Sequence, residues 1–170
     1  MHMSNRTLIL NSHQIEQRLN RLAWQVYENC YDEKEIIIAG IAKNGTRIAE
    51  KIAALLREIS PIQISLIDLT FNKDNPLNEP PFISLSAEEM KGKTVIIIDD
   101  VSNSGRTLIY AVKAFLDFPV NSVQTLVLVD RDHNRFPVKT NYVGLSLATT
   151  LQEHISVEYN GNASDAVYLD

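Results

Sequence analysis

The chain has few cysteines and no long apolar segment, and each shortage excludes a class of protein. Cys30 is the only cysteine among 170 residues, so no disulfide can form within the chain. It falls in a predicted helix, where a small buried hydrophobe is the expected role. No apolar run reaches the roughly 18 residues that a membrane span needs, and the N-terminus lacks a basic segment followed by an apolar one. We therefore expect a cytoplasmic protein that does not enter a membrane.

Positive charge is also in short supply. The 16 Lys and Arg residues are outnumbered by 21 Asp and Glu, which gives a formal net charge of −5. This balance argues against a protein whose main task is to grip a nucleic-acid backbone, although a local basic patch stays open. It does not exclude phosphate ligands, because backbone amides and Mg²⁺ can hold them. The four histidines, His2, His13, His133 and His154, are scattered without the spacing of a metal site.

The apolar segments alternate between two periodicities along the chain. The sequence has no internal repeat, low-complexity tract or linker, so we expect a single domain. Residues 7–10 are a short apolar run that Asn11 or Ser12 ends, either of them capping the next helix. Helical spacing continues from residue 14 to 29, from 48 to 56 and from 108 to 115, whereas strands are predicted at 36–41, 62–71, 94–98 and 123–129. The last forty residues hold short strands and no clear helix.

This alternation predicts a parallel sheet with helices on both faces. Ligands of such sheets bind where strands end at their carboxyl edge, so the loops after Ile41, Ile98 and Val129 are the candidate sites. Ala42–Thr46 is predicted to be a polar loop. Residues 72–92, with three prolines, are predicted to be a mobile loop.

The most informative stretch is VIIIDDVSNSGRT at residues 95–107. A buried strand delivers Asp99 and Asp100 to its carboxyl end, and a small polar turn then opens a helix at about Arg106. The amides of residues 102–107 can point at one spot, where a phosphate fits at the positive end of the helix. The two carboxylates beside it can accept from ribose hydroxyls. The alternative is a strand–turn–helix whose carboxylates only cap the helix. The string is neither a Walker A loop nor a dinucleotide loop.

The same string resembles the PRPP signature of type I phosphoribosyltransferases, in which an apolar strand, two acidic residues and Thr/Ser-Gly-x-Thr/Ser follow one another. The resemblance covers nearly the whole chain. It extends in particular to the bifunctional pyrimidine-operon attenuators with uracil phosphoribosyltransferase activity, the PyrR family, through LILNSHQIEQRLNRLAWQVYEN, GIAKNG, IDLTFNKD and VDRDHNRFPVKTNYVG. It implies a twisted parallel sheet flanked by helices, with a core of about 33–130. A small hood would come from about 1–12 and 131–170, and a flexible loop from about 72–92.

The resemblance also implies roles for particular residues. Asp99 and Asp100 would hold the ribose hydroxyls, and Lys73 in the flexible loop would meet the pyrophosphate as a catalytic charge. The 5′-phosphate and ribose would be bound by the rest of the signature, which consists of Val101, Ser102, Asn103, Ser104, Gly105, Arg106 and Thr107. The pyrophosphate would be bound by Ala42, Lys43, Asn44, Gly45 and Arg131. The base would contact Lys139, Tyr142, Val143 and Leu145. Asp130 is the candidate for Mg²⁺, which would be held mainly through substrate.

Three departures from the family pattern bear on activity. Lys43-Asn44 stands where the attenuators usually have Thr-Arg, and Asn72-Lys73 stands where they have Tyr-Arg. A lysine lacks the bidentate fork of arginine, so catalytic efficiency is affected more than binding. Asn103 stands where the 6-oxopurine enzymes place an Asp next to N7 of the purine. Because an amide cannot accept a proton, Asn103 argues for a pyrimidine base.

These observations lead to two hypotheses from different classes. The first is an enzyme that transfers phosphoribose from PRPP to a nucleobase, uracil being favoured and a purine remaining an alternative, with Mg²⁺ as cofactor. The second is a nucleotide-sensing, RNA-binding attenuator with weak or no transferase activity, which the net charge does not favour. The resemblance implies a homodimer or a larger homo-oligomer.

Overall fold

The computed structural model describes residues 5–170, and its centre is a parallel sheet. Its strands follow the order β3-β2-β4-β5-β6 and all run in one direction. Alternate side chains of β2 enter different apolar clusters, with Ile36 and Ile38 on one face and Ile37 on the other. The predicted α/β fold is confirmed. The strands are β2 (Glu35–Ile41), β3 (Gln63–Leu69), β4 (Thr94–Ser102), β5 (Ser122–Asp130) and β6 (Tyr142–Ser146).

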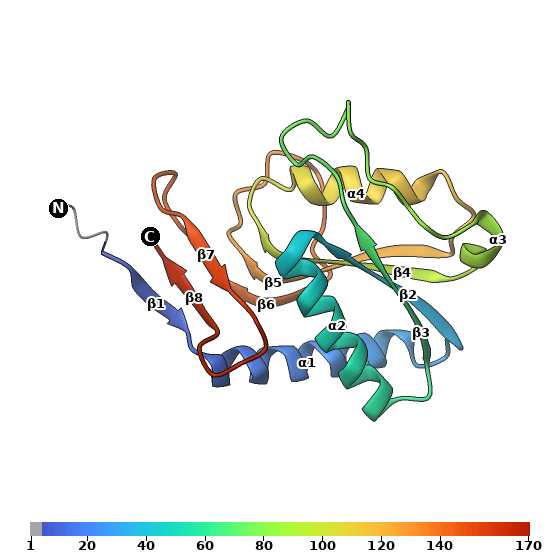
Figure 1. Ribbon diagram of the computed structural model, residues 1–170, viewed down its shortest axis with the longest axis horizontal. Coiled ribbons are helices and arrows are strands. Elements are labelled where there is room, and N and C mark those ends of the chain that lie inside the picture. Colours follow the sequence, from blue (N-terminus) through green and yellow to red (C-terminus); the bar gives the residue numbers. More distant parts are fainter. Residues whose placement is uncertain (1–4) are drawn as a thin grey trace.

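Helices cover both faces of this sheet (Figure 1). Helices α1 (Ser12–Cys30) and α2 (Ala42–Ile59) bury their apolar sides in one cluster, and α4 (Arg106–Leu116) buries its own in the other. Asn11 caps α1, since its side chain accepts from the backbone N–H of Gln14 at 2.9 Å and the Gln14 side chain accepts from that of Asn11. None of the helices in residues 5–170 is long and apolar enough to cross a membrane.

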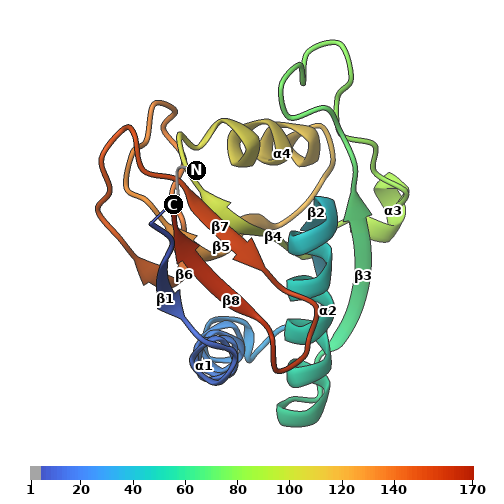
Figure 2. The same cartoon turned by 60° about the vertical axis from the view of Figure 1, so that its left-hand side comes forward.

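The two ends of the described chain meet in a second, antiparallel sheet, which Figure 2 shows beside the main sheet. Its order is β1-β8-β7, with β1 (Thr7–Leu10), β8 (Ala166–Leu169) and β7 (Ile155–Glu158). We expected all of residues 131–170 to lie in the hood. Instead β6 pairs with β5 as the fifth strand of the main sheet, so the hood is smaller.

At three places the secondary structure differs in kind from the sequence-based prediction. The expected loop at Ala42–Thr46 is the first turn of α2, which begins directly after β2. The strand expected to end at Ile98 continues to Ser102, because Asp99, Val101 and Ser102 still pair with β5. The expected loop at 72–92 also contains a short helix, α3 (Ala87–Met90), with a capping box at Ser86.

Candidate active site

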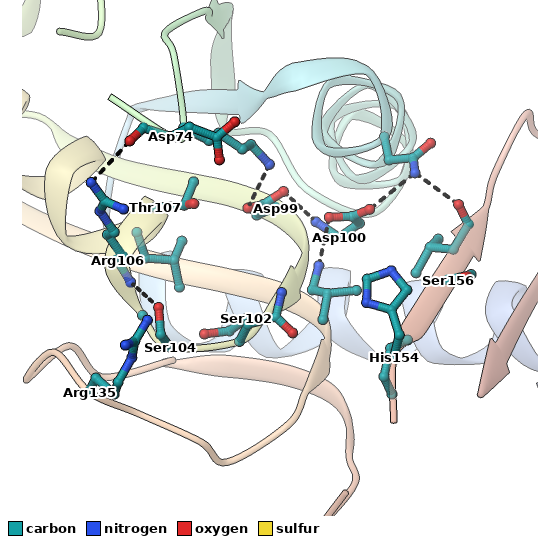
Figure 3. Close-up of a pocket in the computed structure, with 18 residues that line it drawn as sticks. Asp74, Asp99, Asp100, Ser102, Ser104, Arg106, Thr107, Arg135, His154 and Ser156 are labelled. Atoms are coloured by element: carbon teal, nitrogen blue, oxygen red, sulfur yellow. Dashed lines mark hydrogen bonds and ion pairs between the residues drawn. The ribbon is translucent and has the colours of Figure 1, made fainter. Parts of the chain in front are cut away.

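A pocket of about 520 Å³ lies where β4 ends and α4 begins (Figure 3). Five parts of the chain meet there. Helix α2 contributes Asn44, and the segment after β3 contributes Lys73 and Asp74. The second sheet contributes residues 154–157, and the remaining wall is Arg135 and residues 99–108. The structure therefore brings the two aspartates, the polar turn and the flexible-loop lysine together, as the sequence predicted.

Asp99 is the buried member of the aspartate pair. Only 2% of its surface is exposed, and its nearest cation is Lys73, whose Nζ lies 3.5 Å from Oδ2. Burial raises the pKa of Asp99 well above its ordinary value, the charge of Asp100 adds to this rise, and Lys73 opposes it. Since Lys73 is partly exposed, the ion pair compensates only part of the desolvation. A ligand that donates hydrogen bonds to this carboxyl group would stabilise its charged form.

Asp100 is tied to two other elements. Its Oδ2 accepts from the side-chain amide of Asn44 at 3.0 Å, and its Oδ1 accepts from the backbone N–H of Val101 at 2.8 Å. The same Asn44 amide donates to the carbonyl of Val157 at 2.9 Å. Asn44 thus joins the start of α2, the end of β4 and strand β7. Each Asp100 oxygen keeps a free acceptor position for a ligand.

The turn between β4 and α4, residues 102–107, is here called the phosphate loop. No hydrogen bond within residues 5–170 uses the backbone N–H of Asn103, Ser104, Gly105 or Thr107. The buried hydroxyl of Ser102 also has no partner in the described chain. These donors lie at the N-terminus of an 11-residue helix. An anion placed there would be met by several free N–H groups and by the helix dipole.

The shape of the phosphate loop depends on Gly105. Its φ is 83°, a left-handed conformation that glycine adopts readily. A Cβ at this position would lie 2.7 Å from Cγ1 of Val138 and 3.3 Å from the carbonyl of Phe136. The loop is braced from the same side, since the N–H groups of Arg135 and Phe136 donate to the carbonyl of Ser104 at 2.8 and 3.1 Å.

A smaller pocket of about 380 Å³ lies at the start of α2, residues 42–45. It shares Asn44, Lys73, Asp99 and Asp100 with the main pocket, and Lys43 and Arg47 also line it. Ala42 has φ 53°, in the left-handed region. The residues predicted to bind pyrophosphate are therefore adjacent to those predicted to bind ribose, with the exception of Arg131.

Arg131 and Asp130 lie elsewhere. The Arg131 guanidinium donates to Asn103, Thr149, Thr150 and Glu153 and lines a separate pocket of about 670 Å³. The Asp130 carboxylate accepts from the backbone N–H of Asp132 at 2.9 Å and from the hydroxyl of Thr140 at 2.8 Å. Neither side chain lines the main pocket. The geometry does not support the predicted roles of Arg131 at pyrophosphate and of Asp130 at Mg²⁺.

The residues predicted to surround the base are also not brought to the main pocket. The Tyr142 side chain is buried in the core, where its hydroxyl donates to Gln124 at 2.6 Å and burial raises its pKa to about 12. Val143 and Leu145 pack against opposite apolar clusters, and Lys139 is exposed beside them. β6 was predicted to flank the site, but as a strand of the main sheet it directs these side chains into the two cores.

Sequence reasoning missed several residues that line the pocket: Asp74, Arg135 and the segment 154–157. In Figure 3 the His154 ring lies next to Asp100, whereas the Ser156 hydroxyl donates to Asp170. Their place follows from the pairing of β7 with β8, in which Ser156 lies opposite Tyr168. No local pattern in the sequence predicts that these two strands pair. Arg106, in turn, reaches the flexible loop, where its Nη2 donates to the Asp74 carbonyl at 3.2 Å.

Comparisons with known proteins agree with this arrangement. The family model described as phosphoribosyl transferase domain matches residues 5–160. The bifunctional protein PyrR of Haemophilus ducreyi is 34% identical over 158 residues, with 88% of each chain covered. That of Bacillus pumilus is 30% identical over 167 residues, with 93% of each covered. The solved hypoxanthine phosphoribosyltransferase of Trypanosoma cruzi superposes with a TM-score of 0.78 at 14% identity, covering 95% of both chains.

A five-stranded parallel sheet with helices on both faces and a small sheet from the chain ends is thus the type I phosphoribosyltransferase fold. The chain belongs to the phosphoribosyl transferase domain family, and within it to the PyrR-like, PRPP-dependent transferases.

Proposed function

We propose that the protein transfers phosphoribose from PRPP to uracil. The C1–O bond to pyrophosphate breaks, a bond from C1 to the ring nitrogen forms, and that nitrogen loses its proton. The products are a nucleoside monophosphate and pyrophosphate. The observation that carries this proposal is the juxtaposition of Asp99 and Asp100 with four backbone N–H groups of the phosphate loop that have no partner within residues 5–170. Hydroxyl-accepting and phosphate-binding groups then lie side by side, as a phosphorylated ribose requires.

Several residues of the two adjoining pockets would have a part in this reaction. Asp99 and Asp100 accept from the ribose hydroxyls, and residues 102–107 bind the 5′-phosphate. Lys73, Lys43 and the start of α2 take up the charge that develops on the departing pyrophosphate. Lys73 is half-exposed on the 72–92 loop, so closure of that loop over PRPP would carry its charge to the substrate and exclude water.

Mg²⁺ fits this site as a partner of the substrate. No group of three or more His, Cys, Asp or Glu side chains in residues 5–170 could hold a metal by itself. The carboxylates of Asp99 and Asp100 are hard oxygen donors, and Mg²⁺ commonly combines one or two of these with substrate phosphates and waters. When bound, the ion would neutralise charge on the pyrophosphate.

Asn103 supports a pyrimidine base. An amide in the phosphate loop cannot act as general base, and such assistance is typically worth roughly 10²–10⁴-fold in rate. Uracil would not depend on it. The test is a screen of labelled uracil, orotate, hypoxanthine, guanine and xanthine with PRPP and Mg²⁺. We expect uracil to react fastest; hypoxanthine or guanine used at least as well would refute the base assignment and support the purine alternative.

A second candidate function is favoured by the curated relatives, whose name includes the word bifunctional. It is a nucleotide-sensing attenuator that binds RNA and has weak or no transferase activity. The net charge of −5 argues against RNA binding. Lys73, which stands where the attenuators have arginine, argues for weak transferase activity. In the same screen it predicts that PRPP or a nucleotide binds while no base reacts. Both functions are compatible with a homodimer or larger homo-oligomer and with a cytoplasmic location, which we also propose.

A further inference from the structure

Arg131 is almost fully enclosed, and its guanidinium holds four neighbours in place. Only 9% of the residue is exposed. Its Nε donates to the Thr149 hydroxyl at 2.8 Å, and its Nη2 donates to the carbonyls of Thr150 and Glu153 at 3.0 and 2.7 Å. Its Nη1 donates to the side-chain oxygen of Asn103 at 3.1 Å. Arg131 therefore connects the phosphate loop to residues 149–153, and these neighbours are all uncharged acceptors.

The contact with Arg131 decides which way the Asn103 amide points. A guanidinium has donors only, so the oxygen end of the amide must face it. The amide nitrogen, with its two hydrogens, is then the end left for a ligand. Within residues 5–170 no hydrogen bond uses this nitrogen. An asparagine that could present either a donor or an acceptor is thereby restricted to presenting a donor.

The position of Asn103 places this donor at two pockets. Asn103 is exposed and lines both the main pocket and the separate pocket of about 670 Å³ that Arg131 lines. The second pocket continues to Thr149, Thr150 and Leu151, whose side chain is 92% exposed. An exposed apolar side chain beside a fixed polar donor matches a nucleobase, which has apolar faces and a polar edge.

We propose that Arg131 is a positioning residue that fixes Asn103 as a hydrogen-bond donor to the nucleobase. The chain then selects bases that carry a carbonyl oxygen at the edge facing Asn103 and disfavours those that carry an N–H there. The inference rests on the proposed function in one respect, that the ligand is a nucleobase attached to a phosphorylated ribose. It replaces the pyrophosphate role that the sequence predicted for Arg131.

The first test changes Asn103 alone and measures binding. In Asn103→Asp the carboxylate still accepts from Arg131, but the end that faces the ligand becomes an acceptor. Calorimetry with UMP and with ribose 5-phosphate separates the contribution of the base from that of the sugar phosphate. We expect the affinity advantage of UMP over ribose 5-phosphate to fall roughly tenfold, because one hydrogen bond is lost and a carbonyl faces an acceptor. The added negative charge in the phosphate loop should also weaken ribose 5-phosphate binding, so the readout is the ratio of the two affinities and not either affinity alone.

The second test asks whether Arg131 acts through Asn103. Lysine keeps the charge but lacks the planar fork, so Arg131→Lys should release the Asn103 amide and reduce the UMP advantage roughly threefold. In an Asn103→Ala background the same substitution should have no further effect, because residues in one hydrogen-bond network are coupled. Arg21→Lys is the matched control, since Arg21 donates to the Gly144 carbonyl at 2.9 Å. It should leave the advantage unchanged.

The outcomes separate this inference from the proposed function. If UMP loses no more affinity than ribose 5-phosphate in Asn103→Asp, the UMP advantage is unchanged and the inference is overturned. Equal effects of Arg131→Lys in both backgrounds show that Arg131 is only structural. Failure of all bases in the turnover screen refutes the transferase function, but these binding ratios do not depend on turnover. Because Asn103 is exposed, its variants test the inference even if Arg131→Lys does not fold.

Discussion

At two places in the molecule a parallel strand leads into a helix, and both places contain a residue with left-handed φ. Before α4 this residue is Gly105, with φ 83°, and at the start of α2 it is Ala42, with φ 53°. Glycine adopts this conformation freely, whereas the same conformation costs an L-residue roughly 1–2 kcal/mol in conformational free energy. The phosphate loop is therefore already shaped for its ligand, and the start of α2 is held under strain.

Packing explains how the strain at Ala42 persists. Gly45 lets the first turn of α2 approach β4 so closely that a Cβ there would lie 2.7 Å from the Ile98 carbonyl. The hydrogen bonds of Asn44 to Asp100 and Val157 fix the same turn. Strained backbone that the surroundings hold in place is typical of ligand sites. We therefore infer that the phosphate loop is preorganised, whereas the start of α2, to which we assign the pyrophosphate, is expected to rearrange when PRPP binds or leaves.

The substitution Gly105→Ala should have the largest effect. It adds a left-handed alanine and a Cβ that overlaps Val138, so the phosphate loop must move. We expect PRPP affinity to fall at least about a hundredfold by calorimetry with Mg²⁺. Gly92→Ala is the control, because Gly92 has φ 71° and no atom within 4 Å of the added Cβ. If the two variants bind PRPP equally well, the phosphate loop is not the binding site.

Asp100→Asn should weaken PRPP binding less, by roughly ten- to hundredfold. A charged acceptor facing ribose hydroxyls becomes a neutral amide, and a hydrogen bond to a charged group contributes about 1.5–3 kcal/mol. Asp117→Asn, at the far end of α4, is the control for the loss of one negative charge. Unchanged affinity in a folded Asp100→Asn protein would mean that the carboxylate only orders the chain.

Asp99→Asn should raise stability while it weakens ligand binding. Because the pKa of Asp99 is raised in the folded state, the buried charge destabilises the fold at neutral pH. We expect the variant to gain at least about 1 kcal/mol in unfolding free energy, or roughly 2–4 °C.

The gain should be full at pH values above the raised pKa. It should shrink as the pH falls below the raised pKa, because the folded wild type is then protonated and uncharged, and it should vanish below the ordinary value of 3.8, where the unfolded chain is protonated as well. Denaturant unfolding over a pH series measures this difference. If the wild type were more stable than the variant at neutral pH, the conclusion that Asp99 carries a buried, destabilising charge would be wrong.

Ala42→Gly should have the smallest effect. It relieves the left-handed strain but adds freedom to the unfolded chain, so a net gain of about 0.5–1 kcal/mol in unfolding free energy is expected. The substitution Ala54→Gly, at an exposed position within α2, should instead lower the unfolding free energy by about 1 kcal/mol. If both variants lose stability equally, Ala42 is not strained and the contrast between the two helix starts disappears.

Local pattern was sufficient to predict the strand order along the chain and the centre of the site. The apolar run before Asp99 and the small residues after it specify a strand, a turn and a helix within thirteen residues, so no distant contact is needed. A cap at Asn11 or Ser12 was predicted for the same reason, and Asn11 is the residue that caps α1.

What the sequence could not predict depends on contacts between distant residues. Arg131 is held by Asn103, 28 positions away, and by the segment around Thr150. Tyr142 was expected at the base, but the fifth strand turns it into the core. His154 reaches the pocket because its backbone pairs with that of Asp170. The sequence around a charged residue or a tyrosine on a predicted loop does not indicate which distant residues its side chain will contact.

The most direct test of the central claim is a crystal structure with PRPP or a nucleoside monophosphate and Mg²⁺. We predict that the 5′-phosphate lies against the backbone N–H groups of residues 102–107, with the ribose hydroxyls donating to Asp99 and Asp100. A phosphate bound elsewhere, with the phosphate loop covered by side chains, would contradict it.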